Sequence, residues 1–202
     1  MRVAIVGGPG VGKSTLVRQL ADLYHNGSYG EGEKGVWDPR VLEDIANGVN
    51  AVGVTEYFAR LYDANYQDAA LHDRPNKVIF FEGARITLEA HMAEYPREDH
   101  DALRKVLSIG DVWAPDRVIV LTSSTGTIEK HIRMRNRDHE EAENMKRRFR
   151  LIDGEFRRLA PLYPNTIVID RDSKEFHERR GLVEIISAAG LPMFKEIPYA
   201  RV

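Results

Sequence analysis

Residues 7–15, GGPGVGKST, have the types and spacing of a loop that binds phosphate. They match the pattern G-x-x-x-x-G-K-[ST] at every fixed position, between an apolar run and a helical pattern. Glycines let backbone N–H groups converge on an anion without Cβ clashes, and a helix that starts there adds positive potential. In such a loop Lys13 reaches the β- and γ-phosphates of a nucleoside triphosphate, and the Ser14 hydroxyl is a ligand of Mg²⁺. The residues expected to contact the nucleotide are Gly8, Pro9, Gly10, Val11, Gly12, Lys13, Ser14 and Thr15.

A second candidate group follows an apolar run, residues 77–82, that reads as a buried strand ending on Glu82. Parallel sheets bind ligands beyond the carboxyl ends of their strands, so Glu82 is expected near the phosphate-binding loop. There it would ligate Mg²⁺, directly or through water, opposite Ser14. Arg85 would hold a substrate oxygen or phosphate. The alternative is that Glu82 pairs with a nearby basic side chain for structural reasons alone.

Three arginines, Arg133, Arg135 and Arg137, alternate along a charged segment. A guanidinium fork can bind two phosphate oxygens at once and stabilise the charge that develops during phosphoryl transfer. Acidic residues lie in the same segment, so the alternative is a solvated helix with ion pairs such as Arg137 with Glu141. The phosphate-binding loop earlier in the chain favours the first interpretation.

A glycine-rich acidic loop contains Glu31 and Glu33. A carboxylate there would act as the general base for a hydroxyl acceptor, or both residues would simply be solvated. Aromatic residues follow, and each would either stack on a nucleobase or pack in the core. These are Trp37, Tyr57, Phe58 and Tyr62. The seven histidines show no metal-ligand spacing, so we expect them to be structural or on the surface.

The rest of the pattern indicates the elements that must position these groups. Strands are expected at residues 2–6, 77–82, 116–121 and 166–170, with a short one at about 28–31. Helical patterns separate them, including a short helix between Asp38 and Gly48 and a longer one capped by Thr55. Strands that alternate with helices predict an α/β fold with a parallel sheet covered on both faces. We expect a single domain over residues 1–190 and a C-terminal tail over residues 191–202.

The chain has 202 residues, a formal net charge of -2 and no cysteine. This charge balance gives no indication of a nucleic-acid or membrane partner. Without cysteine, disulfides, thiol nucleophiles and cysteine-based zinc sites are excluded. The N-terminal apolar run leads into glycines instead of a cleavage site, and no apolar stretch approaches the length of a membrane span. These features are compatible with a cytoplasmic enzyme, which is our expectation.

Together, these motifs resemble those of the deoxynucleoside kinase and thymidylate kinase superfamily of P-loop kinases, and the deoxynucleoside kinases most. The resemblance extends over about residues 1–190. It rests on the loop at residues 7–15, the acidic loop before Trp37, the strand that ends in Glu82, the segment PDRVIVL at residues 115–121, the arginine-rich segment with its glutamates, and Val168-Ile169-Asp170. The arginine-rich segment is the more specific signal, because many NTPases share the first motif.

The resemblance implies a P-loop fold, with a five-stranded parallel sheet flanked by helices and an arginine-rich lid over about residues 133–141. It also implies a homodimer, and transfer of the γ-phosphoryl of ATP, with Mg²⁺, to the 5′-hydroxyl of a deoxynucleoside. A stable nucleic-acid partner and a membrane partner are not expected.

On the matching positions, Glu33 would be the base, with Glu31 as the alternative, and Glu141 would contact the sugar 3′-hydroxyl. Glu82 matches the family's strand-end acid, but here Gly83 and Ala84 separate it from the arginine that is adjacent in the family. The family's base-reading glutamine has no match near residues 55–57. The candidate catalytic residues are Lys13, Glu33, Arg85, Arg133, Arg135 and Arg137. The candidate substrate-binding residues are Glu31, Trp37, Tyr57, Tyr62, Glu82, Arg85 and Glu141.

Two alternatives remain beside the nucleoside kinase. A nucleoside monophosphate kinase, similar to thymidylate kinase, would need an arginine for the acceptor phosphate, and Arg85 would supply it. A nucleotide-dependent switch or NTPase would bind a protein partner and position a water molecule in place of a small-molecule acceptor.

Overall fold

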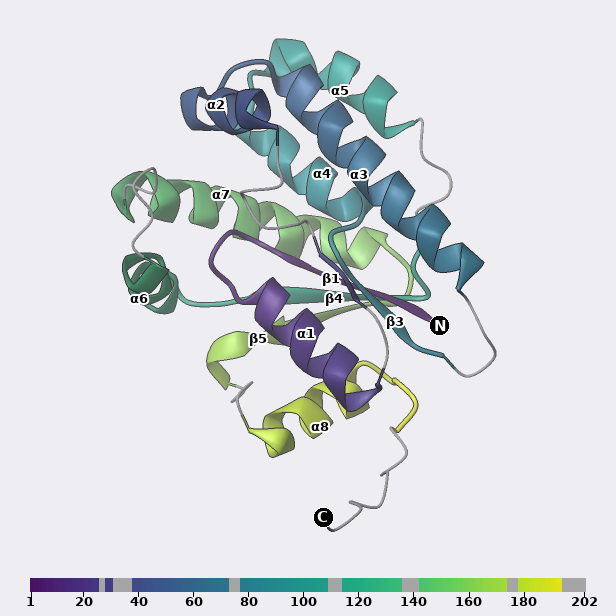
Figure 1. Ribbon diagram of the computed structural model, residues 1–202. Helices are drawn as coiled ribbons and strands as arrows, with labels where there is room; N and C mark the ends of the chain where they lie inside the picture. The colour runs from purple at the N-terminus through teal and green to yellow at the C-terminus, as the bar shows by residue number, and fades with distance from the viewer. Residues whose placement is uncertain are drawn as a thin grey trace.

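A computed structural model describes residues 1–25, 28–30, 38–72, 77–108, 114–135, 142–173 and 178–193. In this part of the chain, five parallel strands form one sheet in the order β2-β3-β1-β4-β5 (Figure 1). The strands are β1 Arg2–Gly7, β2 Ser28–Tyr29, β3 Ile79–Glu82, β4 Arg117–Thr122 and β5 Thr166–Asp170. The five-stranded parallel sheet implied by the resemblance is therefore confirmed.

Helices connect the strands and cover both faces of the sheet (Figure 1). They are α1 Lys13–Leu23, α2 Pro39–Asn47, α3 Ala51–Leu71, α4 Arg85–His91, α5 His100–Leu107, α6 Thr125–Arg135, α7 Ala142–Leu159 and α8 Arg179–Ala188. Helices α1 and α8 lie on one face, and α4 and α7 lie on the other, with α3 and α5 beyond α4 (Figure 1). None of the helices in the described ranges is both long enough and apolar enough to cross a membrane.

Successive residues of β1 alternate between two apolar cores, as the two-residue period of a strand requires. Val3 and Ile5 pack in the core beneath α1 and α8, whereas Ala4 and Val6 pack in the core beneath α4 and α7. Because both faces are buried, the strand reads as a continuous apolar run, which is typical of parallel sheets. This central strand carries the P-loop (residues 7–15) at its carboxyl end.

Helix α2 has the predicted caps. The carboxylate of Asp38 accepts a 2.9 Å hydrogen bond from the backbone N–H of Arg40, and Pro39 occupies the first turn. Gly48 ends the helix with φ 64°, a left-handed conformation that glycine adopts without strain.

The predicted start of the next helix is wrong. Helix α3 begins at Ala51, and its N-cap is Asn50, whose side chain accepts a 3.3 Å hydrogen bond from the backbone N–H of Gly53. Thr55 lies inside the helix and is only 5% exposed. An amide oxygen caps a helix as well as a hydroxyl does, and the burial of Ala51 and Val54 in the core favours the earlier start.

Candidate functional site

The P-loop joins the end of β1 to the start of α1. Gly7, Gly10 and Gly12 have φ values of 148°, 82° and 98°, which residues with a Cβ rarely adopt. A Cβ on Gly7 would lie 2.5 Å from the carbonyl oxygen of Leu121 in β4. The neighbouring strand therefore leaves no room for a side chain where the loop leaves the sheet, and the turn needs glycine there.

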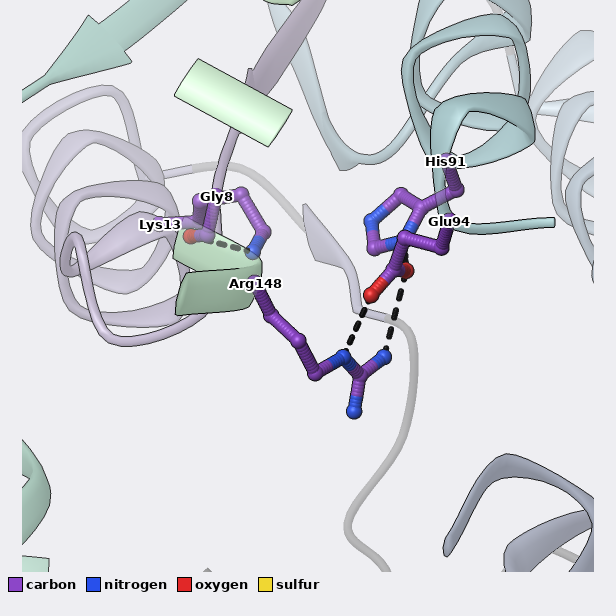
Figure 2. A network of polar contacts seen from close by, with 5 residues as sticks. All are labelled: Gly8, Lys13, His91, Glu94 and Arg148. Atoms are coloured by element: carbon purple, nitrogen blue, oxygen red, sulfur yellow. Dashed lines mark hydrogen bonds and ion pairs between the residues drawn. The ribbon is translucent and has the colours of Figure 1, made fainter. Parts of the chain in front are cut away.

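Helix α7 supports the P-loop from outside the motif. The ring of Phe149 packs so closely that a Cβ on Gly8 would lie 2.8 Å from it. The ammonium group of Lys13 donates a 3.4 Å hydrogen bond to the carbonyl of Gly8, so the lysine side chain folds back over the loop (Figure 2). This is the side on which a bound phosphate would meet both the loop backbone and Lys13.

Ser14 and Glu82 are brought together as the sequence predicts. The Ser14 hydroxyl donates a 2.9 Å hydrogen bond to Oε1 of Glu82, which is 8% exposed at the end of β3. A hydroxyl and a carboxylate are oxygen ligands that suit Mg²⁺, which in nucleotide sites takes one or two protein ligands together with phosphates and water. No cluster of three or more His, Asp or Glu side chains suited to a metal occurs in the described ranges.

Two tyrosines predicted to bind substrate have different surroundings. The ring of Tyr62 is 2% exposed and packs on the backbone of Gly83, where a Cβ would lie 2.3 Å from it. Tyr57 is half-buried and meets Phe58 edge to face, with 5.4 Å between ring centroids. Tyr62 therefore lies beside the residue that follows Glu82, as part of the packed core of α3.

Arg85 is the first residue of α4, and its guanidinium is engaged along that helix. Its Nε donates a 3.0 Å hydrogen bond to Glu89, and both residues interact with the Tyr163 hydroxyl. Burial and these interactions with Glu89 raise the pKa of Tyr163. Tyr163 follows α7 and precedes β5, so this group belongs to the contact between α4 and the end of α7.

The segment predicted to form a lid, residues 133–141, is described only in part. Arg133 is on the surface of α6, 70% exposed, and forms a 2.6 Å ion pair with Glu129. Lys146 of α7 is 2.8 Å from the other oxygen of Glu129, and this pair links α6 to α7. The side chain of Arg135 lies outside the described part, as do Arg137 and Glu141 and, in the acidic loop, Glu31, Glu33 and Trp37.

Three charged or titratable residues that meet between the end of α4 and helix α7 were not singled out from the sequence. Glu94 accepts two hydrogen bonds from the guanidinium of Arg148, one of them to Nη2 at 3.2 Å, and its Oε2 is 2.6 Å from Nδ1 of His91 (Figure 2). Burial alone would raise the pKa of Glu94, but the hydrogen bonds and charges of His91 and Arg148 outweigh it and lower the pKa to about 2. Glu94 is therefore ionised at neutral pH.

A second group that was not predicted borders the P-loop. Nδ1 of His131 in α6 is 3.2 Å from the carbonyl of Gly10, and Nη1 of Arg171 is 2.6 Å from the same ring nitrogen. A Cβ on Gly12 would lie 3.3 Å from Nε of Arg171. The carboxylate of the next residue, Asp172, accepts a 2.8 Å hydrogen bond from the backbone N–H of Ser124. This bond ties the segment after β5 to the segment after β4.

The sequence contains a signal for only some of these residues. Arg171 follows the strand at residues 166–170, and the carboxyl ends of parallel strands are where ligands bind, so this position could have been found. Arg148 is one of many charged residues along α7, and nothing in the local pattern distinguishes it. His91 and Glu94 straddle the end of α4, where they resemble ordinary surface residues.

Comparisons with known proteins agree with this geometry. A family model described as "AAA domain" matches residues 2–158, and no curated protein matches the chain. Deoxyadenosine kinase from M. mycoides with bound dATP has a TM-score of 0.68 at 16% identity, over 93% of this chain and 98% of that chain. The same kinase with bound dCTP has a TM-score of 0.65 at 17% identity, over 93% and 97%. The NadR protein in complex with NR has a TM-score of 0.58 at 20% identity, over 98% of this chain but 54% of that chain.

Identities in this range show a shared fold. The likeness to deoxyadenosine kinases extends over nearly the whole length of both chains, and it confirms, at the level of fold, the resemblance to a superfamily of P-loop kinases. The match of the family model to residues 2–158 includes β1 to β4 and the P-loop. The chain therefore belongs to the AAA domain family, with the fold of a P-loop kinase.

Proposed function

We propose that this protein is a kinase that transfers the γ-phosphoryl of ATP to the 5′-hydroxyl of a nucleoside or deoxynucleoside. The observation that carries the proposal is the 2.9 Å contact between Ser14 of the P-loop and the strand-end Glu82. It supplies the oxygen ligands that a Mg²⁺–triphosphate requires. The similarity of the fold to deoxyadenosine kinases supports a small-molecule acceptor.

In the proposed reaction the acceptor hydroxyl attacks the γ-phosphorus, the bond to the β,γ-bridging oxygen breaks, and ADP leaves. Lys13 and the start of α1 neutralise charge on the transferred phosphoryl group and the leaving group. Ser14 and Glu82 would hold Mg²⁺, which would supply positive charge beside the phosphates. Glu33, with Glu31 as the alternative, accepts the hydroxyl proton, and Arg133, Arg135 and Arg137 stabilise the phosphoryl group from the lid.

A nucleoside monophosphate kinase is the second candidate. Such an enzyme needs a further cation for the phosphate that the acceptor itself carries. This candidate also agrees with the sequence after β3. Gly83 and Ala84 separate Glu82 from Arg85, whereas the acid and the arginine are adjacent in the nucleoside kinases that the chain resembles.

The test is ADP formation with ATP and Mg²⁺ against a panel of nucleosides, deoxynucleosides and their monophosphates. Turnover with a nucleoside supports the first proposal and identifies the accepted base. Turnover that occurs with monophosphates but not with nucleosides supports the nucleoside monophosphate kinase. It also removes the need for a general base at Glu33. A rate of ADP formation that does not depend on any acceptor refutes both kinase proposals and indicates a switch protein or NTPase.

A further inference from the structure

The carbonyl group of Gly10 in the P-loop has a partner on a distant helix. In a planar trans peptide the C=O of one residue points opposite to the N–H of the next, so a loop that turns N–H groups toward an anion turns carbonyl groups away from it. Nδ1 of His131, in α6, lies 3.2 Å from the Gly10 carbonyl oxygen. The imidazole therefore approaches the P-loop from its carbonyl side, opposite to the side that binds phosphate.

The guanidinium of Arg171 lies against both the imidazole and the loop. Its Nη1 is 2.6 Å from Nδ1 and 2.9 Å from Nε2 of the His131 ring. Its Nε and Cζ are 3.3 and 3.6 Å from the place that a Cβ on Gly12 would take. Gly12 is the N-cap residue of α1 and has φ 98°. The two side chains thus meet the P-loop at Gly10 and at the start of α1.

The hydrogen-bonding roles of these groups indicate the protonation of His131. A carbonyl oxygen only accepts and a guanidinium only donates, whereas each ring nitrogen of a neutral imidazole does one or the other. A proton on Nδ1 satisfies the Gly10 carbonyl and leaves Nε2 as the acceptor for Arg171. A doubly protonated ring would offer Arg171 no acceptor and would add a positive charge beside it. The contacts therefore favour the neutral ring with its proton on Nδ1.

Both side chains come from segments that are tied to each other at the end of the sheet. The carboxylate of Asp172, the residue after Arg171, accepts hydrogen bonds from the Ser123 hydroxyl at 2.6 Å and from the Ser124 N–H at 2.8 Å. Ser123 and Ser124 lie between β4 and α6, the helix that carries His131. The two side chains are therefore held relative to the ends of β4 and β5, as a positioning role requires.

The P-loop is also held from the core. Val11, between the two contacted glycines, is fully buried in the core beneath α1 and α8. The backbone from Gly10 to Gly12 thus lies between this core and the pair of His131 with Arg171. Its N–H groups can converge on an anion only if this short stretch keeps its conformation, so contacts on its carbonyl side bear directly on phosphate binding.

The charge of Arg171 also relates the pair to an anion. The N-terminus of a helix carries partial positive charge, and Lys13 adds a full charge in the same turn. Another cation beside Gly12 therefore disfavours the loop without an anion, whereas bound phosphate makes the same cation favourable. Phosphate binding explains this placement better than folding stability does.

We propose that His131 and Arg171 are positioning residues for the donor nucleotide, which hold the P-loop so that its N–H groups face the phosphates. The inference deepens the proposed function, on which it rests for the identity of the donor as a nucleoside triphosphate. It assigns the pair to the phosphate part of the donor, through the loop, and not to the acceptor.

The first test measures binding without turnover. Calorimetry compares Mg²⁺–ADP and Mg²⁺–tripolyphosphate in the wild type, His131→Leu, His131→Asn and Lys130→Met, where Lys130 is an exposed neighbour in α6. We expect His131→Leu to weaken the binding of both ligands about 3–10-fold, the range for one hydrogen bond, and Lys130→Met to bind as the wild type does. Asparagine can place an amide N–H near the position of Nδ1, so His131→Asn should restore most of the affinity. A His131→Asn variant that binds no better than His131→Leu would contradict the hydrogen bond to Gly10.

Replacement of Arg171 keeps the test valid if His131→Leu fails to fold, which circular dichroism would reveal. Arg171→Met should also weaken the binding of both ligands. The double variant should lose less than the product of the two single losses, because the pair acts as a unit. A loss confined to ADP would mean that the pair contacts the nucleoside part of the ligand directly, which would overturn the positioning role. Folded variants that match Lys130→Met with both ligands would overturn the inference altogether.

Steady-state kinetics separate this inference from the proposed function. The KM for ATP should rise in His131→Leu and Arg171→Met, while the KM for the acceptor stays at its wild-type value. A rise in the KM for the acceptor alone would contradict the assignment to the donor. A wild type that binds both phosphate ligands with the help of the pair but turns over no acceptor would refute the proposed function and leave this inference standing.

Discussion

The hydroxyl of Ser14 and the carboxylate of Glu82 are joined by a 2.9 Å hydrogen bond across 68 positions of the sequence. The bond follows from the pairing of β1 with β3, in which Ile5 lies opposite Glu82. Strand β1 continues to Gly7, and the P-loop then returns the chain so that the first turn of α1 meets the end of β3. The two residues therefore share one edge of the sheet, at its carboxyl end.

Substitution at either member of this pair is expected to weaken the response to Mg²⁺. Ser14→Ala removes a proposed metal ligand, and Glu82→Gln keeps the shape of the side chain but removes its charge. We expect each to lower activity about 10–100-fold, a range typical of groups that hold a metal's ligands. The measurement is initial rate against Mg²⁺ concentration. Glu98→Gln, at an exposed position, is the control, and identical Mg²⁺ curves for all variants would argue against a metal site.

Lys13→Ala is expected to abolish phosphoryl transfer while the fold remains intact. The lysine contacts only the loop carbonyl of Gly8 among the hydrogen bonds described for it, and it is not part of the apolar core, so its loss should change stability little. Activity and circular dichroism measured on the same preparation check both parts. Near-normal turnover in this variant would show that the P-loop lysine takes no part in phosphoryl transfer.

The ion pair of Glu94 predicts a particular loss of stability in acid. Its pKa is lowered from 4.5 to about 2 in the folded protein, so the folded state binds this proton less readily than the unfolded chain does. The resulting stabilisation is complete above about pH 4.5 and is lost as the pH falls toward 2. We expect the free energy of unfolding to fall more steeply over this range in the wild type than in Glu94→Gln.

Urea titrations at a series of pH values in that range provide the measurement. Other carboxylates, including Asp172 with its pKa lowered to about 2, titrate in both proteins, so the difference between the two curves isolates Glu94. Parallel curves would mean that the ion pair with Arg148 does not persist in solution.

Gly83→Ala should destabilise the fold by about 2 kcal/mol or more, since φ at this position is +95° and left-handed backbone costs a residue with a Cβ about 1–2 kcal/mol. The new methyl group would also meet the ring of Tyr62, which is buried and cannot move freely. Thermal and urea unfolding give the magnitude. Gly154→Ala in α7, where a Cβ would have open space, is the matched control and should stabilise the helix by up to about 1 kcal/mol.

Local signals predicted most of the elements but not every boundary. The caps of α2 at Asp38 and Gly48 were recognised because a capping residue and its helix turn are neighbours in sequence. For α3, Thr55 was predicted to be the capping residue, whereas Asn50 caps the helix. Both residues are good caps, and the packing of Ala51 and Val54 in the core decides between them.

Local sequence patterns were enough to identify the P-loop, the alternation of strands and helices, and Glu82 as a strand-end carboxylate near Ser14. These depend on local backbone geometry and on the rule that parallel strands present their carboxyl ends at one edge. The contacts of Arg148 with Glu94, across 54 positions, and of Arg171 with His131, across 40, could be found only from the folded structure. The packing of α7 and β5 against the rest of the molecule sets those contacts, and no residue spacing within a single element encodes them.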